Sequence, residues 1–338
     1  MRTVPKFHVV GGDVVKEMVE SSRAEIFATV EKAYRLHAAG KSVNPDSYFL
    51  RYPDNPSARI IALPAHLGGD VQRSGIKWIA SFPENIKDNL ARASAVQILN
   101  DATTGYPLAC LDAALTSATR TAASAALAAE NLAPAPFEGT LCVVGTGVIA
   151  RTTIEWLLFR EWKFDRIVLF DLSRAEADRF ANWLRTEHGQ AVEIADSLEG
   201  AIRASSLVLF TTTSATPYVE DASWFDHAPT VLHVSLRDIS ADIILGAQNI
   251  LDDVEHCMKA NTSVHLAEQK TGNRDFVDGT LVDVLEGKVR PDKARPRIFS
   301  PFGLGVLDVA VCNMVLEQAV AKGKALEVPN FLAGSTRW

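Results

Sequence analysis

A glycine-rich turn is the segment whose residue types point most directly to chemistry. The apolar run Thr140–Val144 leads into Gly145–Ala150, which has the spacing G-x-G-x-x-A and opens a helical pattern. In such a turn the first glycine permits a tight reversal, the second lets the backbone approach a pyrophosphate, and the small third residue allows close helix packing. Amides at the helix N-terminus then bind the anion. The pattern predicts a dinucleotide site contacted by Gly145, Thr146, Gly147, Val148 and Ile149.

An acidic residue follows at the position that such a site requires. Asp171 ends the second predicted strand, Arg166–Asp171, where its carboxylate can accept hydrogen bonds from ribose hydroxyls. Because a carboxylate repels a 2′-phosphate, Asp171 favours NAD over NADP; Arg174 either offsets that preference or starts a solvated helix. Hydroxyl residues near the strand ends complete the expected cofactor site, with a plain loop as the alternative for the threonines: Ser173, Thr211, Thr212, Thr213 and Ser235.

Two cations lie in segments that offer them no charged neighbour. Arg120 is the only charged residue between Ala113 and Ala129, and Lys77 stands in the apolar stretch SGIKWIASF. A buried charge needs a partner, and a planar guanidinium suits a carboxylate. We interpret both cations as ligands of a substrate carboxylate; a structural ion pair with a distant Asp or Glu is the alternative. Two further arginines are candidates for the same role: Arg51, on an expected hairpin strand, and Arg92.

A single aspartate follows another predicted strand of the same part of the chain. Asp238 follows Thr230–Leu236 after one intervening residue, and ligands of doubly wound sheets bind beyond the carboxyl ends of the strands. A carboxylate there can act as a general acid or base, and an N-cap of the next helix is the alternative. The adjacent residues Glu255, His256 and Cys257 do not share a helix face, so we expect no metal site.

The spacing of apolar residues indicates the elements that must position these groups. Beyond the proline-bearing boundary Asn131–Gly139, short β-branched runs alternate with helical patterns, as in β-α-β units on a parallel sheet. We therefore expect an α/β protein with a Rossmann-type, doubly wound parallel sheet over residues 139–304. Its expected strands and helices are Thr140–Val144, Val148–Glu161, Arg166–Asp171, Ser173–His188, Ala191–Ala195, Leu198–Ala204, Ser206–Thr212 and Thr230–Leu236.

The remaining residues indicate a discontinuous α+β domain, made of residues 1–130 and 305–338. Gly305–Ala321 has helical periodicity but too few residues around it to form a domain, so it should pack on the N-terminal part. The expected elements of that part are a hairpin of Tyr48–Tyr52 and Ala58–Leu63 around the turn PDNPS, strands Ile76–Ala80 and Ala95–Leu99, and a long helix Leu111–Leu132.

Composition narrows the class of protein. The 338 residues are 47% hydrophobic and 22% charged, which suits a globular protein with a full core. With 34 basic and 41 acidic side chains the net charge is −7, and the absence of a basic run argues against a nucleic-acid partner. Four separated cysteines encode no disulfide framework, and no signal peptide or membrane span is evident. We expect a soluble, cytoplasmic protein.

Together these residues make the chain resemble the ornithine cyclodeaminase/μ-crystallin family. The likeness covers nearly the full chain and is carried by SYFLRYPDNPSARIIALPA, SGIKWIASFPENI, ARASAVQILNDATTGYP, SATRTAASAA, VVGTGVIA and SPFGLGVLDVAV. It implies a Rossmann domain that binds NAD(H), a small anionic amino-acid substrate, and a homodimer formed through the discontinuous domain, which also binds the substrate.

The resemblance also implies residue roles. The substrate-carboxylate arginine of the RTAA helix falls on Arg120, the substrate-contacting strand lysine on Lys77, and the hairpin arginine on Arg51. Asp238 corresponds to the catalytic aspartate, and Lys77 is expected to assist it. The surrounding sequence SLRD departs from the glycine-rich version of cyclodeaminases, which argues against a plain ornithine enzyme.

The segments ALPA and IKWIASFPENI are similar to the branch of the family that oxidises N-(2-amino-2-carboxyethyl)-L-glutamate. The implied reaction transfers hydride from the glutamate α-carbon to NAD+, and water activated by Asp238 hydrolyses the imine. The products are 2-oxoglutarate and L-2,3-diaminopropionate, a siderophore or antibiotic precursor. Cyclodeamination or imine reduction within the family, and a non-catalytic crystallin-like ligand-binding protein, remain alternatives.

Overall fold

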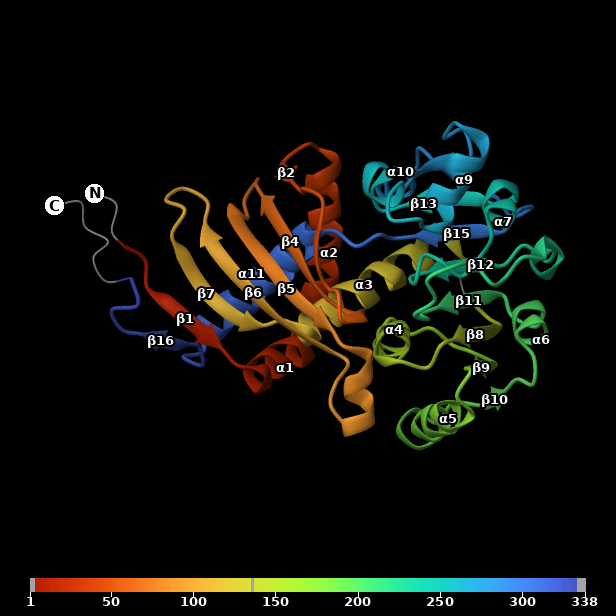
Figure 1. Cartoon of the computed structure of the whole chain (residues 1–338), viewed down its shortest axis with the longest axis horizontal. Helices are drawn as coiled ribbons and strands as arrows, with labels where there is room; N and C mark the ends of the chain where they lie inside the picture. The colour runs from red at the N-terminus through yellow and green to blue at the C-terminus, as the bar shows by residue number, and fades with distance from the viewer. Residues whose placement is uncertain (1–3, 135–136, 333–338) are drawn as a thin grey trace. The chain divides into compact units, whose positions relative to one another are not determined.

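The chain divides into two compact units in the computed structural model of Figure 1, which describes residues 4–134 and 137–332. The first unit comprises Met1–Arg120 and Leu304–Trp338, and the second comprises Thr121–Gly303. Helix α3 (Ala114–Leu132) passes from one to the other. Part of the expected boundary Asn131–Gly139 lies outside the described residues. Within those residues, no helix has both the length and the apolar character that a membrane crossing needs.

The first unit is built on one eight-stranded sheet. Its strand order is β16-β1-β7-β6-β5-β4-β2, with β3 paired to β4, and only β1 and β7 run parallel among its pairs. The expected hairpin is confirmed, and its second strand is longer than predicted. The strands are β1 (Phe7–Val10), β2 (Ser42–Val43), β3 (Tyr48–Tyr52), β4 (Asn55–Leu67), β5 (Arg73–Ser81), β6 (Ala93–Asp101), β7 (Pro107–Asp112) and β16 (Leu326–Val328).

Helix α11 (Gly305–Ala321) covers one face of this sheet, as the sequence predicted. It packs against β4, β5 and β6 and against the helices α1 (Gly12–Ser21) and α2 (Arg23–Ala38). Residues on nearly all sides of α11 are buried, which is typical of a helix that is apolar all round. A short 3-10 helix, η1 (Pro83–Asp88), connects β5 to β6.

The opposite face of the same sheet carries large apolar side chains that remain accessible. Cross-strand pairing places Tyr48, Trp78 and Val96 in one row, and their exposed fractions are 79%, 41% and 38%. Ile98 continues the face on β6 and is 36% exposed. Exposed apolar side chains grouped on one face make that face a candidate interaction surface.

The second unit is a parallel sheet in the order β10-β9-β8-β11-β12-β15-β13-β14. The order reverses between β8 and β11, and at such a switch point the carboxyl ends of the strands open a ligand crevice. This confirms the predicted fold class. The strands are β8 (Thr140–Val144), β9 (Arg166–Phe170), β10 (Val192–Ile194), β11 (Leu207–Phe210), β12 (Thr230–His233), β13 (Gln248–Leu251), β14 (Val277–Thr280) and β15 (Arg297–Ser300).

Helices connect these strands and bury an aliphatic core against the sheet, in which Val144, Val208 and Ile298 are at most 2% exposed. The helices are α4 (Val148–Phe159), α5 (Arg174–His188), α6 (Leu198–Arg203), α7 (Ala241–Gly246), α8 (Val254–Cys257), α9 (Ser263–Thr271) and α10 (Leu281–Leu285), with the 3-10 turn η2 (Ala222–Phe225).

Several expected boundaries were wrong by a few residues, for local reasons. The strand predicted to reach Leu236 ends at His233, because the chain turns there and Leu236 takes a φ of +70°. The long helix begins at Ala114 rather than at Leu111, since Leu111 and Asp112 belong to β7.

Candidate functional site

Two glycines shape the turn: Gly145 has a backbone conformation that favours glycine, and Gly147 has free space beside it. Gly145 has a φ of +87°, and a Cβ there would lie 3.1 Å from the Thr211 backbone, so a larger residue does not fit. Gly147 caps α4 without a side-chain hydrogen bond, and nothing lies within 4 Å of where its Cβ would be. Val148 is 59% exposed and Ile149 is partly buried. The uncapped amides and the open space beside Gly147 fit a pyrophosphate.

Asp171 is fastened to this turn. Its Oδ2 accepts hydrogen bonds from the backbone N–H and the hydroxyl of Thr146, both at 2.8 Å, and its Oδ1 accepts from the backbone N–H of Ser173 at 2.8 Å. A carboxylate has about four lone-pair positions, so capacity for ribose hydroxyls remains. Ser173 caps α5, and exposed Arg174 contacts Asp178 at 3.2 Å, as a solvated helix start would.

The predicted hydroxyl residues do different things. The Thr211 hydroxyl donates to the Gly145 carbonyl oxygen at 2.8 Å and so ties β11 to the glycine turn. The Thr212 and Ser235 hydroxyls donate to Asp238. Thr213 makes no side-chain hydrogen bond to any residue that the structure describes, which leaves its hydroxyl for a ligand. The cofactor role of each remains a prediction.

The Asp238 carboxylate is fully buried and contacts three hydroxyl donors and one imidazole nitrogen, which also accepts from the Asp238 backbone N–H at 3.1 Å. Oδ1 accepts from Tyr218 Oη at 2.9 Å and from the Thr212 hydroxyl. Oδ2 accepts from the Ser235 hydroxyl and lies 3.1 Å from His233 Nε2. Thr212 and Tyr218 follow β11, Ser235 follows β12, and His233 is the last residue of β12, so the carboxyl ends of two adjacent strands build this group.

The donors decide the charge state of Asp238. Burial alone raises a carboxyl pKa, but the hydrogen bonds and the charge interaction from His233, with those from Ser235 and Thr212, outweigh it and hold the pKa of Asp238 at about 2. Burial and the neighbouring carboxylate raise the pKa of Tyr218. At neutral pH the site therefore holds an anionic carboxylate beside a protonated phenol. Asp238 can take up a proton only when it loses some of these donors.

The alternative reading of Asp238 as an N-cap was wrong. Helix α7 is capped by Ser240, two residues later, and no side-chain hydrogen bond closes the cap. The turn through Leu236 instead directs the Asp238 carboxylate back toward β11 and β12.

In the first unit, Lys77 and Arg120 converge on one buried carboxylate. Lys77 Nζ lies 2.7 Å from Asp308 Oδ2 and 2.9 Å from Ser117 Oγ, and Arg120 Nε lies 3.0 Å from Asp308 Oδ1. Lys77 is 2% and Asp308 1% exposed. Burial and the charge of Arg120 lower the pKa of Lys77, Asp308 acts in the opposite direction, and the net pKa is about 8. Two cations thus share one anion, which leaves an excess positive charge that suits an anionic ligand.

Asp308 is a site residue that sequence reasoning missed, as it missed Tyr218 and His233. It supplies the distant carboxylate that the ion-pair alternative for Arg120 and Lys77 required. A signal for it exists, because Asp308 is the only charged residue from Gly305 to Leu316. The same test of a lone charge in an apolar helix that singled out Arg120 would have found it.

Arg51 and Arg92 lie away from Lys77, toward one end of strands β3 to β6. Arg59, which the sequence analysis did not suggest, lies with them. Arg51 pairs across strands with Arg59, and the Arg51 guanidinium lies 5.4 Å from the centre of the Phe49 ring. Arg92 donates to Ser81 Oγ at 3.0 Å. The predicted site residues therefore form two groups within the first unit and one in the second.

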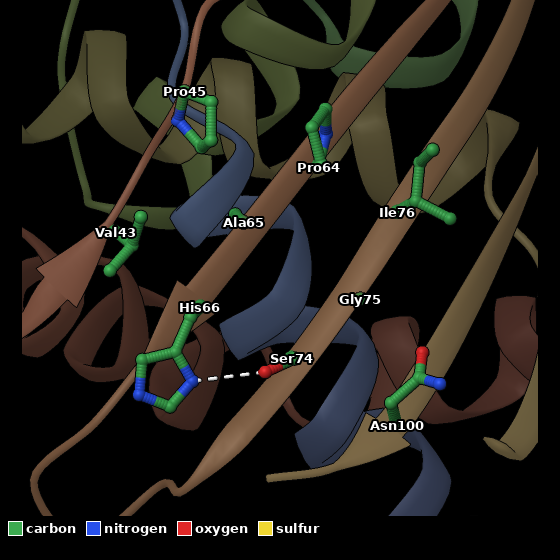
Figure 2. Close-up of a pocket in the computed structure, with 9 residues that line it drawn as sticks. All are labelled: Val43, Pro45, Pro64, Ala65, His66, Ser74, Gly75, Ile76 and Asn100. Carbon is green, nitrogen blue, oxygen red and sulfur yellow. Dashed lines mark hydrogen bonds between the residues drawn. The ribbon is translucent and has the colours of Figure 1, made fainter. Parts of the chain in front are cut away.

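A pocket of about 300 Å³ opens on the apolar face of the first sheet (Figure 2). Its wall includes Pro64 of β4 and Ile76 of β5. These residues are next in sequence to Leu63 and Lys77, and because side chains alternate along a strand they point to the side of the sheet opposite to Lys77. His66 Nδ1 lies 3.0 Å from Ser74 Oγ at its edge. The pocket contains no predicted site residue, and it belongs to the face that carries Trp78.

Among the described residues, no group of three or more His, Cys, Asp or Glu side chains could hold a metal ion. His256 Nδ1 instead contacts Asp253 at 2.8 Å, and Cys257 Sγ contacts Asp252 at 3.2 Å. These side chains act as local structural contacts.

Comparison with known proteins matches the chain to one protein family and to named relatives. The sequence model of the ornithine cyclodeaminase/mu-crystallin family matches residues 12–323. N-((2S)-2-amino-2-carboxyethyl)-L-glutamate dehydrogenase of Staphylococcus aureus is 28% identical over 90% of this chain and 93% of its own length. Alanine dehydrogenase of Archaeoglobus fulgidus is 30% identical over 94% of this chain and 98% of its own.

The fold is matched as well. The crystal structure of an archaeal alanine dehydrogenase dimer with bound NAD superposes with a TM-score of 0.83 at 27% identity, covering 96% of this chain and all of that one.

Proposed function

Because this chain belongs to the ornithine cyclodeaminase/mu-crystallin family, we propose that it is an NAD-dependent dehydrogenase that oxidises a carbon–nitrogen bond of an anionic amino acid. The observation that carries this proposal is the pair of buried cations, Lys77 and Arg120, that share the single carboxylate of Asp308. An excess buried positive charge is stabilised by a ligand that brings a carboxylate.

The second unit supplies the residues that would hold the cofactor. The amides beside Gly147 would bind the pyrophosphate, and Asp171 would accept from the ribose hydroxyls and disfavour a 2′-phosphate. Gly145, Thr146, Val148 and Ile149 complete the turn; Ser173, Arg174, Thr211, Thr212, Thr213 and Ser235 are the further candidates of the predicted set. When bound, NAD+ accepts the hydride from the substrate carbon.

The substrate we propose is N-(2-amino-2-carboxyethyl)-L-glutamate. The relative from Staphylococcus aureus is named for this reaction, and the compound carries three carboxylates. The first unit offers Lys77 and Arg120 at one position and Arg51 and Arg92 at another, more cations than a substrate with one carboxylate needs. The balanced reaction consumes the conjugate, NAD+ and water and yields 2-oxoglutarate, L-2,3-diaminopropionate, NADH and a proton.

Each group of the chain has a step in this proposal. Lys77 and Arg120 would fix the carboxylate next to the reacting carbon, which keeps the α-carbon oriented for hydride loss. Asp238 would accept a proton from the water that adds to the imine carbon, and release of the Thr212 and Ser235 hydroxyls would raise its pKa toward that task. Collapse of the carbinolamine then breaks the carbon–nitrogen bond.

An absorbance assay for NADH with the glutamate conjugate, followed by identification of both products, tests this function. We expect NADH together with equal amounts of 2-oxoglutarate and diaminopropionate. NADH formation with alanine or ornithine but not with the conjugate would refute the substrate, and a cyclic product would indicate cyclodeamination. Cofactor and amino-acid binding without NADH from any of them would favour a ligand-binding protein.

We also propose that two copies of the chain associate through the apolar face of the first sheet. Trp78, Val96 and Ile98 are exposed on that face, Ile98 pairs across strands with the pocket residue Ile76, and the archaeal neighbour is described as a dimer. Light scattering should give twice the chain mass of 36.7 kDa. Trp78→Glu should shift the mass toward one chain, whereas Lys16→Glu, an exposed change on α1, should not. A monomeric wild type would refute this.

A further inference from the structure

Three arginines gather at one end of the first sheet. Register pairs Arg51 with Arg59 across β3 and β4, and Arg59 with Ser81 across β4 and β5. Arg92 lies beside the start of β6, where its carbonyl accepts from the Phe82 backbone N–H at 2.8 Å and its guanidinium donates to Ser81 Oγ at 3.0 Å. Arg59 and Arg92 therefore both neighbour Ser81, and Arg51 lies one strand farther out, beside Arg59.

This arrangement lacks the counter-charge that a structural cluster would have. Within residues 4–134 and 137–332, no carboxylate lies within 4 Å of a guanidinium nitrogen of these three arginines. Like charges directly opposite on neighbouring strands destabilise a sheet, and burial together with the positive charge of Arg51 lowers the pKa of Arg59. Burial and the charge of Arg59 lower the pKa of Arg92 in the same way. The fold tolerates repulsion that an anion would relieve.

The cluster shares a sheet face with Lys77. Residues 77 and 81 of β5 are four apart, and side chains of a strand alternate, so Lys77 and Ser81 point to the same side. Their Cα atoms are separated by roughly 13 Å at about 3.3 Å per residue. Arginine and lysine side chains bridge part of that span, which leaves a distance between charged groups that fits two carboxylates of one extended small molecule.

The geometry points to Arg59 and Arg92 as a specificity subsite that binds a carboxylate remote from the reacting carbon, with Arg51 at its open side. This inference rests on the proposed function, since it assigns one carboxylate to Lys77 and Arg120 and a distant one to the arginine cluster. A fork of two guanidiniums binds a carboxylate through charge-assisted hydrogen bonds. A substrate with one carboxylate leaves the cluster unsatisfied, so the chain selects a polycarboxylate amino acid.

Kinetics of Arg59→Gln test the subsite, with Arg35→Gln on the surface of α2 as the matched control. Loss of one charge-assisted hydrogen bond should raise KM for the glutamate conjugate by about 10- to 100-fold, with KM for NAD+ unchanged. Two substrate analogues identify which carboxylate binds to the arginine cluster. N-(2-aminoethyl)-L-glutamate lacks the carboxylate of the aminoethyl arm, and the other analogue lacks the glutamate side-chain carboxylate. For one of them, wild type and Arg59→Gln should give the same KM.

Two readouts separate this role from a structural one and from failure of the proposed function. Because Arg59 faces a like charge, Arg59→Gln should keep or raise the Tm; a lowered Tm would indicate a structural role. Tricarballylate, a tricarboxylate without an amine, should raise the Tm of wild type and of Arg35→Gln more than that of Arg59→Gln, whichever substrate the enzyme oxidises. Equal shifts in all three proteins, or an unchanged KM in Arg59→Gln, would overturn the subsite.

Discussion

Replacement of Asp308 by Asn tests the buried charge group that underlies the proposed substrate site. The amide keeps the volume of the side chain but removes the only carboxylate that contacts both Lys77 Nζ and Arg120 Nε in the described part of the chain. Lys77 is 2% exposed and cannot recover hydration without moving. Removal of one partner from a buried ion pair costs about 3–5 kcal/mol, which corresponds to a Tm lower by roughly 6–20 °C for a unit of this size.

Chemical denaturation of Asp308→Asn and of a matched control measures this cost. Asp70→Asn removes the carboxylate from the exposed pair with Lys32, where the two side chains are 66% and 51% accessible, so its effect should stay below about 1 kcal/mol. Adding Lys77→Met to Asp308→Asn removes one uncompensated cation and should restore about 1 kcal/mol or more. If Asp308→Asn is as stable as Asp70→Asn, the two cations are not held by this carboxylate and the reasoning fails.

Four further substitutions probe the second unit. Asp238→Asn should lower kcat by about 10²- to 10⁴-fold with NAD+ binding retained; full activity would remove Asp238 from the mechanism. Because folding lowers the pKa of Asp238 from 3.8 to about 2, its ionised form stabilises the fold by about 2 kcal/mol above pH 4. Denaturation should show that this difference in free energy of unfolding between wild type and Asp238→Asn disappears as the pH falls toward 2. Gly147→Ala should leave the free energy of unfolding within about 0.5 kcal/mol of wild type but weaken NAD+ binding in calorimetry, whereas Gly145→Ala should destabilise the fold by about 1 kcal/mol or more. Asp171→Ser should lower the ratio of kcat/KM for NAD+ to kcat/KM for NADP+ by about tenfold or more. An unchanged ratio would show that Asp171 does not distinguish the ribose hydroxyl of NAD+ from the 2′-phosphate of NADP+.

Features encoded by neighbouring residues could be predicted from the sequence. The run Thr140–Val144 and the turn at Gly145 and Gly147 follow from β-branched composition and glycine spacing, and the structure has them at those residues. The helix Gly305–Ala321 was predicted with both ends correct because its apolar residues recur over the whole segment. The hairpin around residues 53–54 was likewise readable from its turn residues.

Features that depend on distant residues needed the tertiary structure. Asp308 is 231 positions from Lys77 and 188 from Arg120, and no local pattern shows that they meet. Asp238 was found by its place after a strand, but the order of the parallel strands brings its four partners together from the end of β12 and from the loops after β11 and β12. Arg59 could not be recognised as a site residue from the sequence, because strand register decides that it lies opposite Arg51.

The sequence by itself determined the type of fold, the position of the dinucleotide turn and the list of isolated charges, because each depends on residue types within one element. Only the tertiary structure decided which charges contact one another. It brings Lys77 and Arg120 to one anion. It brings no carboxylate of the described residues within 4 Å of the guanidinium groups of Arg51, Arg59 and Arg92. The physical reason is that strand register and helix packing bring together groups from remote segments. Electrostatic interactions act over a few ångströms, whatever the separation along the chain.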